Sequence, residues 1–141
     1  MTLGTQTTEA ETAMTYYFSK ILKTGFDEAL RRTTEALKRE GFGIITEIDV
    51  RDTLKKKLDV DFRNYRILGA CNPKLAYEAL RLEDKVGTML PCNVVVAETG
   101  DGGIEVAAID PVASMAAIDN PRLKQMADEV REKLRRVVAD V

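Results

Sequence analysis

The sequence of 141 residues contains no histidine and no tryptophan, and only two cysteines. The absence of histidine excludes Ser-His-Asp triads, Cys-His pairs and His-bearing metal motifs. Any catalysis would have to use Cys, Asp, Glu, Lys or Tyr side chains. Two cysteines do not form a disulfide framework in a chain of this size, so reduced thiols are expected. The sequence therefore leaves open whether the protein is an enzyme, and it indicates no cofactor.

An excess of one charge and a long hydrophobic run are missing as well. The 21 basic and 23 acidic residues are interleaved along the chain and give a net charge of −2. Without a basic stripe, we expect no nucleic acid partner. No run of about eighteen apolar residues could span a membrane, and the N-terminus lacks the pattern of a secretory signal. We therefore expect a cytoplasmic protein with no membrane partner.

The composition fits one globular unit. Hydrophobic residues make up 45% of the chain, enough for a single core at this length. Residues 1–13 are Thr-rich and polar, and they are predicted to form a disordered tail. Residues 14–141 are expected to form a single α+β domain, because no linker or internal repeat divides them.

The hydrophobic pattern predicts alternating strands and helices. Residues 16–22, 43–48, 62–71, 92–98 and 104–109 are β-branched and aromatic enough for strands, whereas helical spacing or a cap followed by proline predicts helices beginning near residues 26, 50, 73, 111 and 121. Gly100-Asp101-Gly102-Gly103 predicts a tight hairpin between the last two strands. Thr24 resembles the cap of the first helix. The segment 85–90 fits no element clearly.

The short helix after Asp49 is predicted to bury one face and expose the other. Val50, Leu54 and Leu58 are spaced to share the buried face. The run Lys55-Lys56-Lys57 could bind an anion, but lysines near the end of a short helix are typical of a solvated face that complements the helix dipole. We favour the solvated face, because no Gly-rich loop follows.

The order of elements predicts a two-layer α+β sandwich. The hairpin requires antiparallel pairing, so we expect a mostly antiparallel sheet of about five strands with helices on one face. The other face would need a polar coat or a partner. Alternating apolar residues on the strands favour a homodimer formed through that face.

Two segments carry a family resemblance. Gly69 to Leu80 reads GACNPKLAYEAL and Val86 to Val96 reads VGTMLPCNVVV. Together with residues 41–70, they resemble the domain of unknown function 302 family over roughly residues 16–115. The resemblance implies a compact α+β fold like that of the TATA-box-binding protein, and often a homodimer. It implies no established activity.

The residues that match the signature of this family form the candidate site: Cys71, Asn72, Pro73, Pro91 and Cys92. Asn72 is predicted to cap the helix that starts at Pro73, and a cap alone would explain it. Cys71 precedes that helix start, where the dipole would lower the pKa of a thiol. Both cysteines could equally be small buried hydrophobic residues. Two thiols are half of a tetrahedral zinc site, so no metal site is assigned.

Two functions fit these observations. The first is a non-catalytic homodimeric module that binds a small ligand, an anion or a metal near the start of the Asn72 helix. The second is a thiol-dependent protein for redox or sulfur transfer, with Cys71 as the nucleophile and Cys92 as the resolving partner. We favour the first, and the reactivity of the thiols distinguishes the two.

Overall fold

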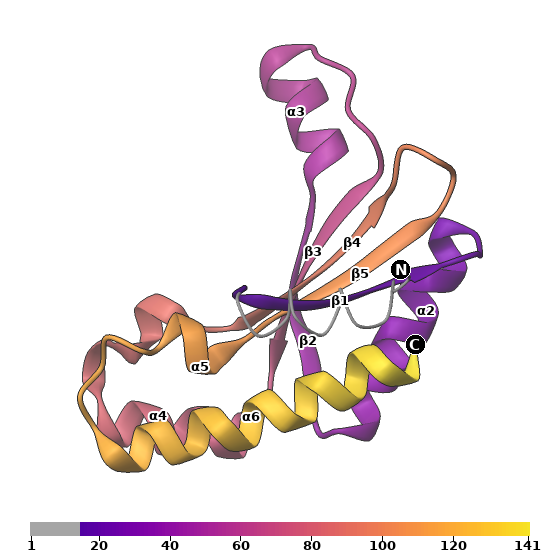
Figure 1. The fold of residues 1–141 in the computed structure, drawn as a ribbon. Helices are drawn as coiled ribbons and strands as arrows, with labels where there is room; N and C mark the ends of the chain where they lie inside the picture. The colour runs from indigo at the N-terminus through magenta and orange to yellow at the C-terminus, as the bar shows by residue number, and fades with distance from the viewer. Residues whose placement is uncertain (1–14) are drawn as a thin grey trace.

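The structure is a computed structural model that describes residues 15–141. Its elements, in chain order, are β1 (Tyr17–Leu22), α2 (Phe26–Arg39), β2 (Gly43–Asp49), α3 (Val50–Leu58), β3 (Tyr65–Cys71), α4 (Pro73–Leu82), the 3₁₀ helix η1 (Asp84–Met89), β4 (Cys92–Glu98), β5 (Ile104–Ile109), α5 (Pro111–Ser114) and α6 (Pro121–Asp140) (Figure 1). The polar tail expected over residues 1–13 lies outside the described residues.

The five strands form one sheet in the order β1-β5-β4-β3-β2, and every neighbouring pair is antiparallel. The Gly-rich segment after Glu98 forms the predicted hairpin, with the Thr99 amide donating to the Gly103 carbonyl. The prediction of an antiparallel α+β fold is therefore confirmed. A bulge interrupts β2, where the pairing with β3 shifts register between Ile44 and Thr46.

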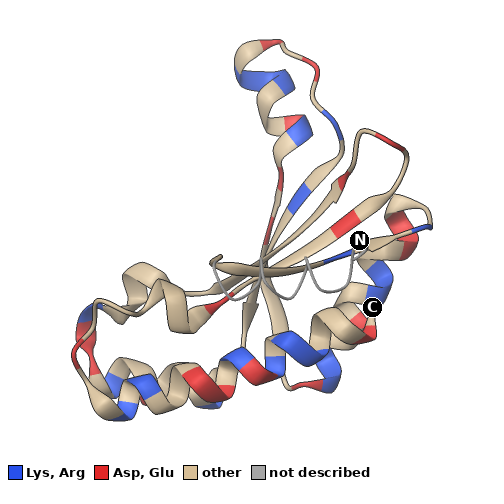
Figure 2. Cartoon of the chain, viewed as in Figure 1, with Lys and Arg blue, Asp and Glu red and all other residues tan. Residues whose placement is uncertain are grey.

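Helices α2 and α6 pack against the sheet and enclose the main core. Strand side chains such as Val94 and Val106 are fully buried there, together with Leu37 of α2 and Leu134 of α6. Figure 1 shows α2 beside the C-terminal half of α6, whereas α4 and α5 gather around its N-terminal half. Lys, Arg, Asp and Glu are interspersed along the outer sides of these helices (Figure 2).

Four helices begin with an Asn or Asp whose side chain caps the first turn. In α4, α5 and α6 a proline follows the cap, as the sequence predicts. The side chains of Asp49, Asn72, Asp110 and Asn120 each accept a hydrogen bond from a backbone N–H two or three residues later. These bonds satisfy amides that the first helical turn leaves without a partner. The cap predicted for α2 is wrong, because Gly25 is the N-cap and makes no side-chain bond.

The buried face predicted for the short helix is also wrong. Helix α3 has no buried residue, and Leu58 is 65% exposed. The helix projects from the end of the β2 and β3 strands, away from the other helices (Figure 1), so no core lies beneath it. Lys55 and Lys56 form ion pairs with Asp59 and Asp52, each with 3.0 Å between N and O. The lysine run is a solvated face, as predicted.

Two boundaries differ from the sequence interpretation. Strand β3 begins at Tyr65 rather than at Phe62, and the Phe62 ring instead packs beside the Tyr65 ring with 6.1 Å between centroids. The unassigned segment forms η1, whose Val86 is fully buried. The sequence of η1 shows no clear hydrophobic period, because a 3₁₀ helix of six residues makes only two turns.

Candidate functional site

The candidate site lies where the end of β3 meets the start of β4. Ala70 and Cys92 are paired across the two strands, and both side chains belong to the main core. Helix α4 starts two residues after the end of β3, and η1 leads into β4. The two cysteine segments, about twenty residues apart in the sequence, are therefore neighbours in the fold.

Asn72 fixes the start of α4. Its Oδ1 accepts a hydrogen bond from the Leu75 amide at 3.3 Å, and Pro73 occupies the first helical position. A proline there has the helical φ already and lacks an N–H that would need a partner. The sequence Asn72-Pro73 thus turns the chain from the sheet into the helix, as predicted.

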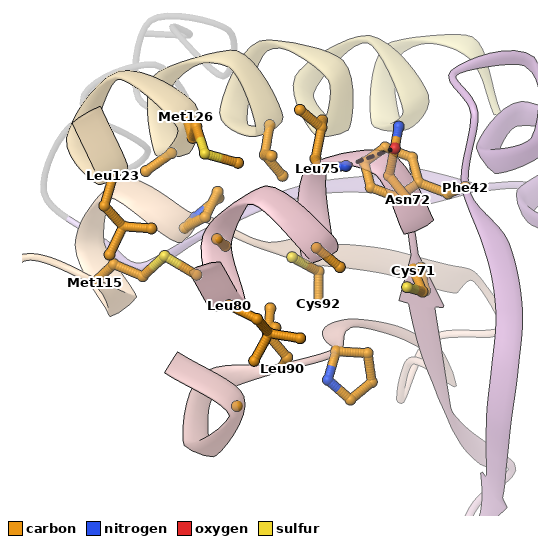
Figure 3. Close-up of a pocket in the computed structure, with 18 of the residues that line it drawn as sticks. Phe42, Cys71, Asn72, Leu75, Leu80, Leu90, Cys92, Met115, Leu123 and Met126 are labelled. Atoms are coloured by element: carbon orange, nitrogen blue, oxygen red, sulfur yellow. Dashed lines mark hydrogen bonds between the residues drawn. The ribbon is translucent and has the colours of Figure 1, made fainter. Parts of the chain in front are cut away.

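A cavity of about 320 Å³ lies between α4, α6 and this end of the sheet. Apolar side chains form almost all of its wall, and these are Phe42, Ile45, Ala70, Leu75, Ala76, Ala79, Leu80, Leu90, Pro91, Pro111, Met115, Leu123, Met126, Ala127 and Val130; Gly87 and the polar or sulfur-bearing Cys71, Asn72 and Cys92 complete it. Figure 3 shows Cys92 and the side chains of Leu80, Met115, Leu123 and Met126 around this space. The cavity is partly open to solvent.

A second apolar cluster forms the far wall of the cavity. It consists of the buried residues Ala79, Val86, Met115, Leu123 and Ala127, with half-buried Met89, Leu90, Val112, Ile118 and Met126 against them. These residues come from α4, η1, α5 and α6 and from the segments that directly follow η1 and α5. Asn120 ties two of these helices together, because its Nδ2 donates to the Leu82 carbonyl at 3.4 Å.

Four of the five residues proposed from the sequence line the cavity: Cys71, Asn72, Pro91 and Cys92. Pro73 starts α4 but is not part of the wall. Pro91 lies close above Gly69 of β3, where a Cβ atom would come within 2.8 Å of the Pro91 Cγ. Glycine at that position therefore allows the η1–β4 connection to fold over the sheet.

The cysteines do not form the pair that the sequence suggested. Both are free, and Cys92 points to the core side of the sheet with its partner Ala70. Cys71 is the last residue of β3, and its side chain lines the same cavity as Cys92. Figure 3 shows the two sulfur atoms apart. A disulfide or a shared metal ion would require the two sulfur atoms to lie next to each other.

Burial also makes Cys92 a poor nucleophile. It raises the pKa of the Cys92 thiol from 9.0 to about 11. A thiol with such a pKa is almost entirely protonated at neutral pH, and only the thiolate attacks disulfides. Cys92 is 8% exposed and behaves as a small apolar residue of the cavity wall.

The start of α4 has few free donors for an anion. Pro73 has no amide hydrogen, the Leu75 amide is bonded to the Asn72 side chain, and the Ala76 amide is bonded to the Asn72 carbonyl. Only the Lys74 amide of the first turn is left without one of these partners. Within residues 15–141, no three His, Cys, Asp or Glu side chains gather closely enough to hold a metal ion.

Sequence reasoning missed the residues that α5 and α6 contribute to the wall. Met115, Leu123, Met126 and Ala127 follow the site in the sequence by more than twenty residues. The apolar residues of α6 recur at helical spacing, but such a stripe looks the same in sequence whether it faces packed side chains or a cavity. Only the position of α4 opposite α6 shows that part of this stripe borders a cavity.

Comparison with known proteins identifies the family. The chain matches the sequence profile of the domain of unknown function DUF302 over residues 18–141. The protein belongs to the DUF302 family. The structure is similar to the crystal structure of an uncharacterised conserved DUF302 protein from Bacillus stearothermophilus, with a TM-score of 0.82 and 29% sequence identity over 89% of this chain and 97% of that chain.

Two negative findings accompany the family assignment. Among proteins with curated descriptions, none matches the chain. Within residues 15–141, no helix is long and apolar enough to cross a membrane.

Proposed function

We propose that this DUF302 domain is a non-catalytic, homodimeric module that binds a small, uncharged and largely apolar ligand in the cavity between α4, α6 and the sheet. The observation that carries the proposal is the cavity itself: about 320 Å³ with a wall of apolar side chains, two thiols and one amide side chain. Small-molecule sites are concave and mostly apolar, with volumes from about 300 Å³ upward.

The wall chemistry favours an uncharged ligand over an anion or a metal ion. A charged group buried there would lose its hydration without gaining a partner of opposite charge, which is costly. The Asn72 side-chain oxygen Oδ1 already accepts from the Leu75 amide, so the Asn72 side-chain NH₂ group is the main polar contact left for a ligand. A single hydroxyl or carbonyl on an otherwise apolar ligand would suit this arrangement.

Thiol chemistry has less support. The nucleophile–resolver scheme needs the sulfur atoms of Cys71 and Cys92 to meet, and they lie apart in Figure 3. The high pKa of Cys92, about 11, removes the resolving thiolate at neutral pH. Iodoacetamide at pH 7 should accordingly label the half-exposed Cys71 before the buried Cys92.

The test is binding of an uncharged fluorescent probe, N-phenyl-1-naphthylamine, to the full chain. We expect saturable binding with one site per chain, and displacement by decanol at lower concentration than by decanoate. Ala127→Phe should abolish binding, because Ala127 lines the cavity and the ring would fill it. Ala139→Phe is the matched control, an exposed alanine on the same helix.

Two outcomes would contradict the proposal. One is equal probe binding by the Ala127→Phe and Ala139→Phe variants, which would place the probe elsewhere. The other is stronger displacement by decanoate than by decanol, which would indicate an anion site. If Ala127→Phe does not fold, as judged by circular dichroism, Ala127→Leu provides the same comparison with a smaller side chain.

The cytoplasmic location expected from the sequence stays a prediction. The homodimer is part of the proposal, and the surface that would form it is argued next.

A further inference from the structure

The sheet has a second face whose side chains alternate with those of the core. Strand pairing places nine of them in two adjacent rows: Ile48, Ile67, Val95, Ala107 and Ser19 in the central row, and Tyr65, Ala97, Glu105 and Ile21 in the neighbouring row. We call these nine residues the open face. None of them belongs to the two buried clusters that the helices enclose.

The centre of the open face is apolar and incompletely covered. Ile67, Val95 and Ala107 lie side by side on three neighbouring strands and are all half-buried, while Ile48 at the end of the row is 47% exposed. A shallow hollow of about 330 Å³ runs over this region, lined by Tyr65, Val95, Ala97, Glu105 and Ala107 among others. An apolar centre with a polar rim is the pattern of a protein interface.

The rim carries one acidic and one basic group on either side of β4. Glu105 lies on β5, and Arg63 precedes β3 on the opposite side of the same hollow. No ion pair joins Glu105 or Arg63 to another described residue. The Arg63 guanidinium stands over the Phe62 and Tyr65 rings, 4.9 and 5.3 Å from their centroids.

We propose that a second copy of the chain packs on the open face, with the two-fold axis running along the central strand β4. This rests on the proposed homodimer and names its interface. Rotation about β4 places β5 of one copy over β3 of the other, as in aligned sheet packing. Val95 then meets its own counterpart on the axis.

This arrangement pairs unlike side chains across the interface. The small Ala107 of one copy lies over the larger Ile67 of the other, because both belong to the central row. In the neighbouring row, Glu105 lies over Tyr65 and beside Arg63. The two-fold axis makes each of these contacts twice. The open face is therefore complementary to itself in side-chain size and in charge.

Residues 1–14 are the other occupant that the chain itself offers, since they precede Tyr16 and Tyr17 at the edge of the hollow. Their sequence, MTLGTQTTEAETAM, contains only three large apolar side chains. Such a polar segment matches an apolar row poorly. A second copy supplies an apolar row of the same kind.

Sedimentation equilibrium of the full chain across micromolar concentrations tests the interface. We expect a species of twice the 15.7 kDa chain mass. Val95→Asp should raise the dimer dissociation constant by at least about 100-fold, because two carboxylates would meet on the axis. Leu58→Asp is the matched control, since Leu58 is an exposed aliphatic residue on α3, and it should leave the constant unchanged.

Exchange of the charges at Glu105 and Arg63 tests the relative orientation of the two copies, and it places no charge at the apolar centre of the interface. Glu105→Arg and Arg63→Glu should each weaken the dimer by about tenfold, since two ion pairs of modest strength are lost. The double variant should recover most of the affinity. Failure of the double variant to recover would overturn the two-fold axis along β4.

A monomer at all concentrations would overturn the inference, and so would a chain that dimerises only after residues 1–14 are deleted. An unchanged dimer in Val95→Asp would overturn it as well. Failure here is distinguishable from failure of the ligand proposal, because none of these four positions lines the α4–α6 cavity. Probe binding by Val95→Asp should match that of the unchanged chain.

Discussion

Helix α6 packs very differently along its two halves. Its C-terminal half places Leu134, Val137 and Val138 in the main core against the sheet and α2. Its N-terminal half places Leu123 and Ala127 in the second cluster, beside the cavity that α4 faces. The same apolar stripe is therefore fully packed at one end and only partly packed at the other.

The difference follows from what lies opposite each half. The C-terminal half faces a continuous sheet, whose paired strands supply side chains at regular spacing. The N-terminal half faces short helices, and two of the four α4 side chains that line the cavity are the small Ala76 and Ala79. Small residues on facing helices leave volume unfilled, and interiors otherwise pack to nearly crystalline density. We interpret the main core as the stabilising region and the cavity region as the binding region.

The largest expected effect comes from truncation in the main core. Leu134→Ala should lower the free energy of unfolding by about 2–5 kcal/mol, because Leu134 is fully buried and leaves a new void. Met126→Ala should cost distinctly less, since Met126 is half-buried and already borders empty space. Urea unfolding measures both. Equal losses would remove the distinction between the two regions.

Enlarging an alanine should have opposite consequences in the two regions. Ala36→Leu should destabilise by about 1–3 kcal/mol, because Ala36 is fully buried among close neighbours. Ala76→Leu adds the same atoms to the cavity wall, so its unfolding free energy should change by less than about 1 kcal/mol while probe binding weakens. A strongly destabilised Ala76→Leu variant would show that the cavity cannot accept added volume.

Removal of a helix cap should lower the free energy of unfolding more when the helix packs against a core than when it is exposed. Asn120→Ala should cost about 1 kcal/mol, because it removes the bond to the Leu123 amide and a contact to α4. Asp49→Ala removes the same type of bond from α3, which has no buried residue, and should cost less. Thermal unfolding of both variants gives the comparison. A larger loss for Asp49→Ala would contradict it.

The smallest effect concerns the ion pair that joins the two helices of the main core. Arg136 donates two hydrogen bonds to Glu40, at 3.1 and 3.0 Å, and these bonds lower the pKa of Glu40 below its ordinary 4.5. A lowered carboxyl pKa contributes stability above pH 4.5 that is lost as the pH falls through the folded-state value. The stability difference between the unchanged chain and Glu40→Gln should therefore shrink on acidification below pH 4.5. A constant difference from pH 7 to pH 3 would contradict this.

The sequence predicted the fold well because its signals are local. Alternation marked the strands, Gly100 to Gly103 marked the hairpin, and Asn72 and Asn120 marked helix starts. The helical spacing of Val50, Leu54 and Leu58 predicts one buried face on α3, and the structure shows none. Spacing alone cannot show whether a core lies beneath a helix.

The candidate site was only partly predictable. The resemblance pointed to Cys71, Asn72, Pro91 and Cys92, and these do line the cavity. Met115 and Met126 could not be found, because their contact with the site depends on how α6 crosses α4. The relative position of the two cysteines depends on the β3–β4 register. In this register Cys92 pairs with Ala70 and not with Cys71.

The most direct test of the account is a titration of the ¹³C-methyl-methionine-labelled chain with decanol, followed by NMR. Met115 and Met126 line the cavity, so their methyl resonances should shift in a saturable manner with one site per chain. The same methyl groups should not respond in Ala127→Phe. Absence of any shift in the unchanged chain, or equal shifts in the filled variant, would contradict the claim that the cavity between α4 and α6 is the binding site.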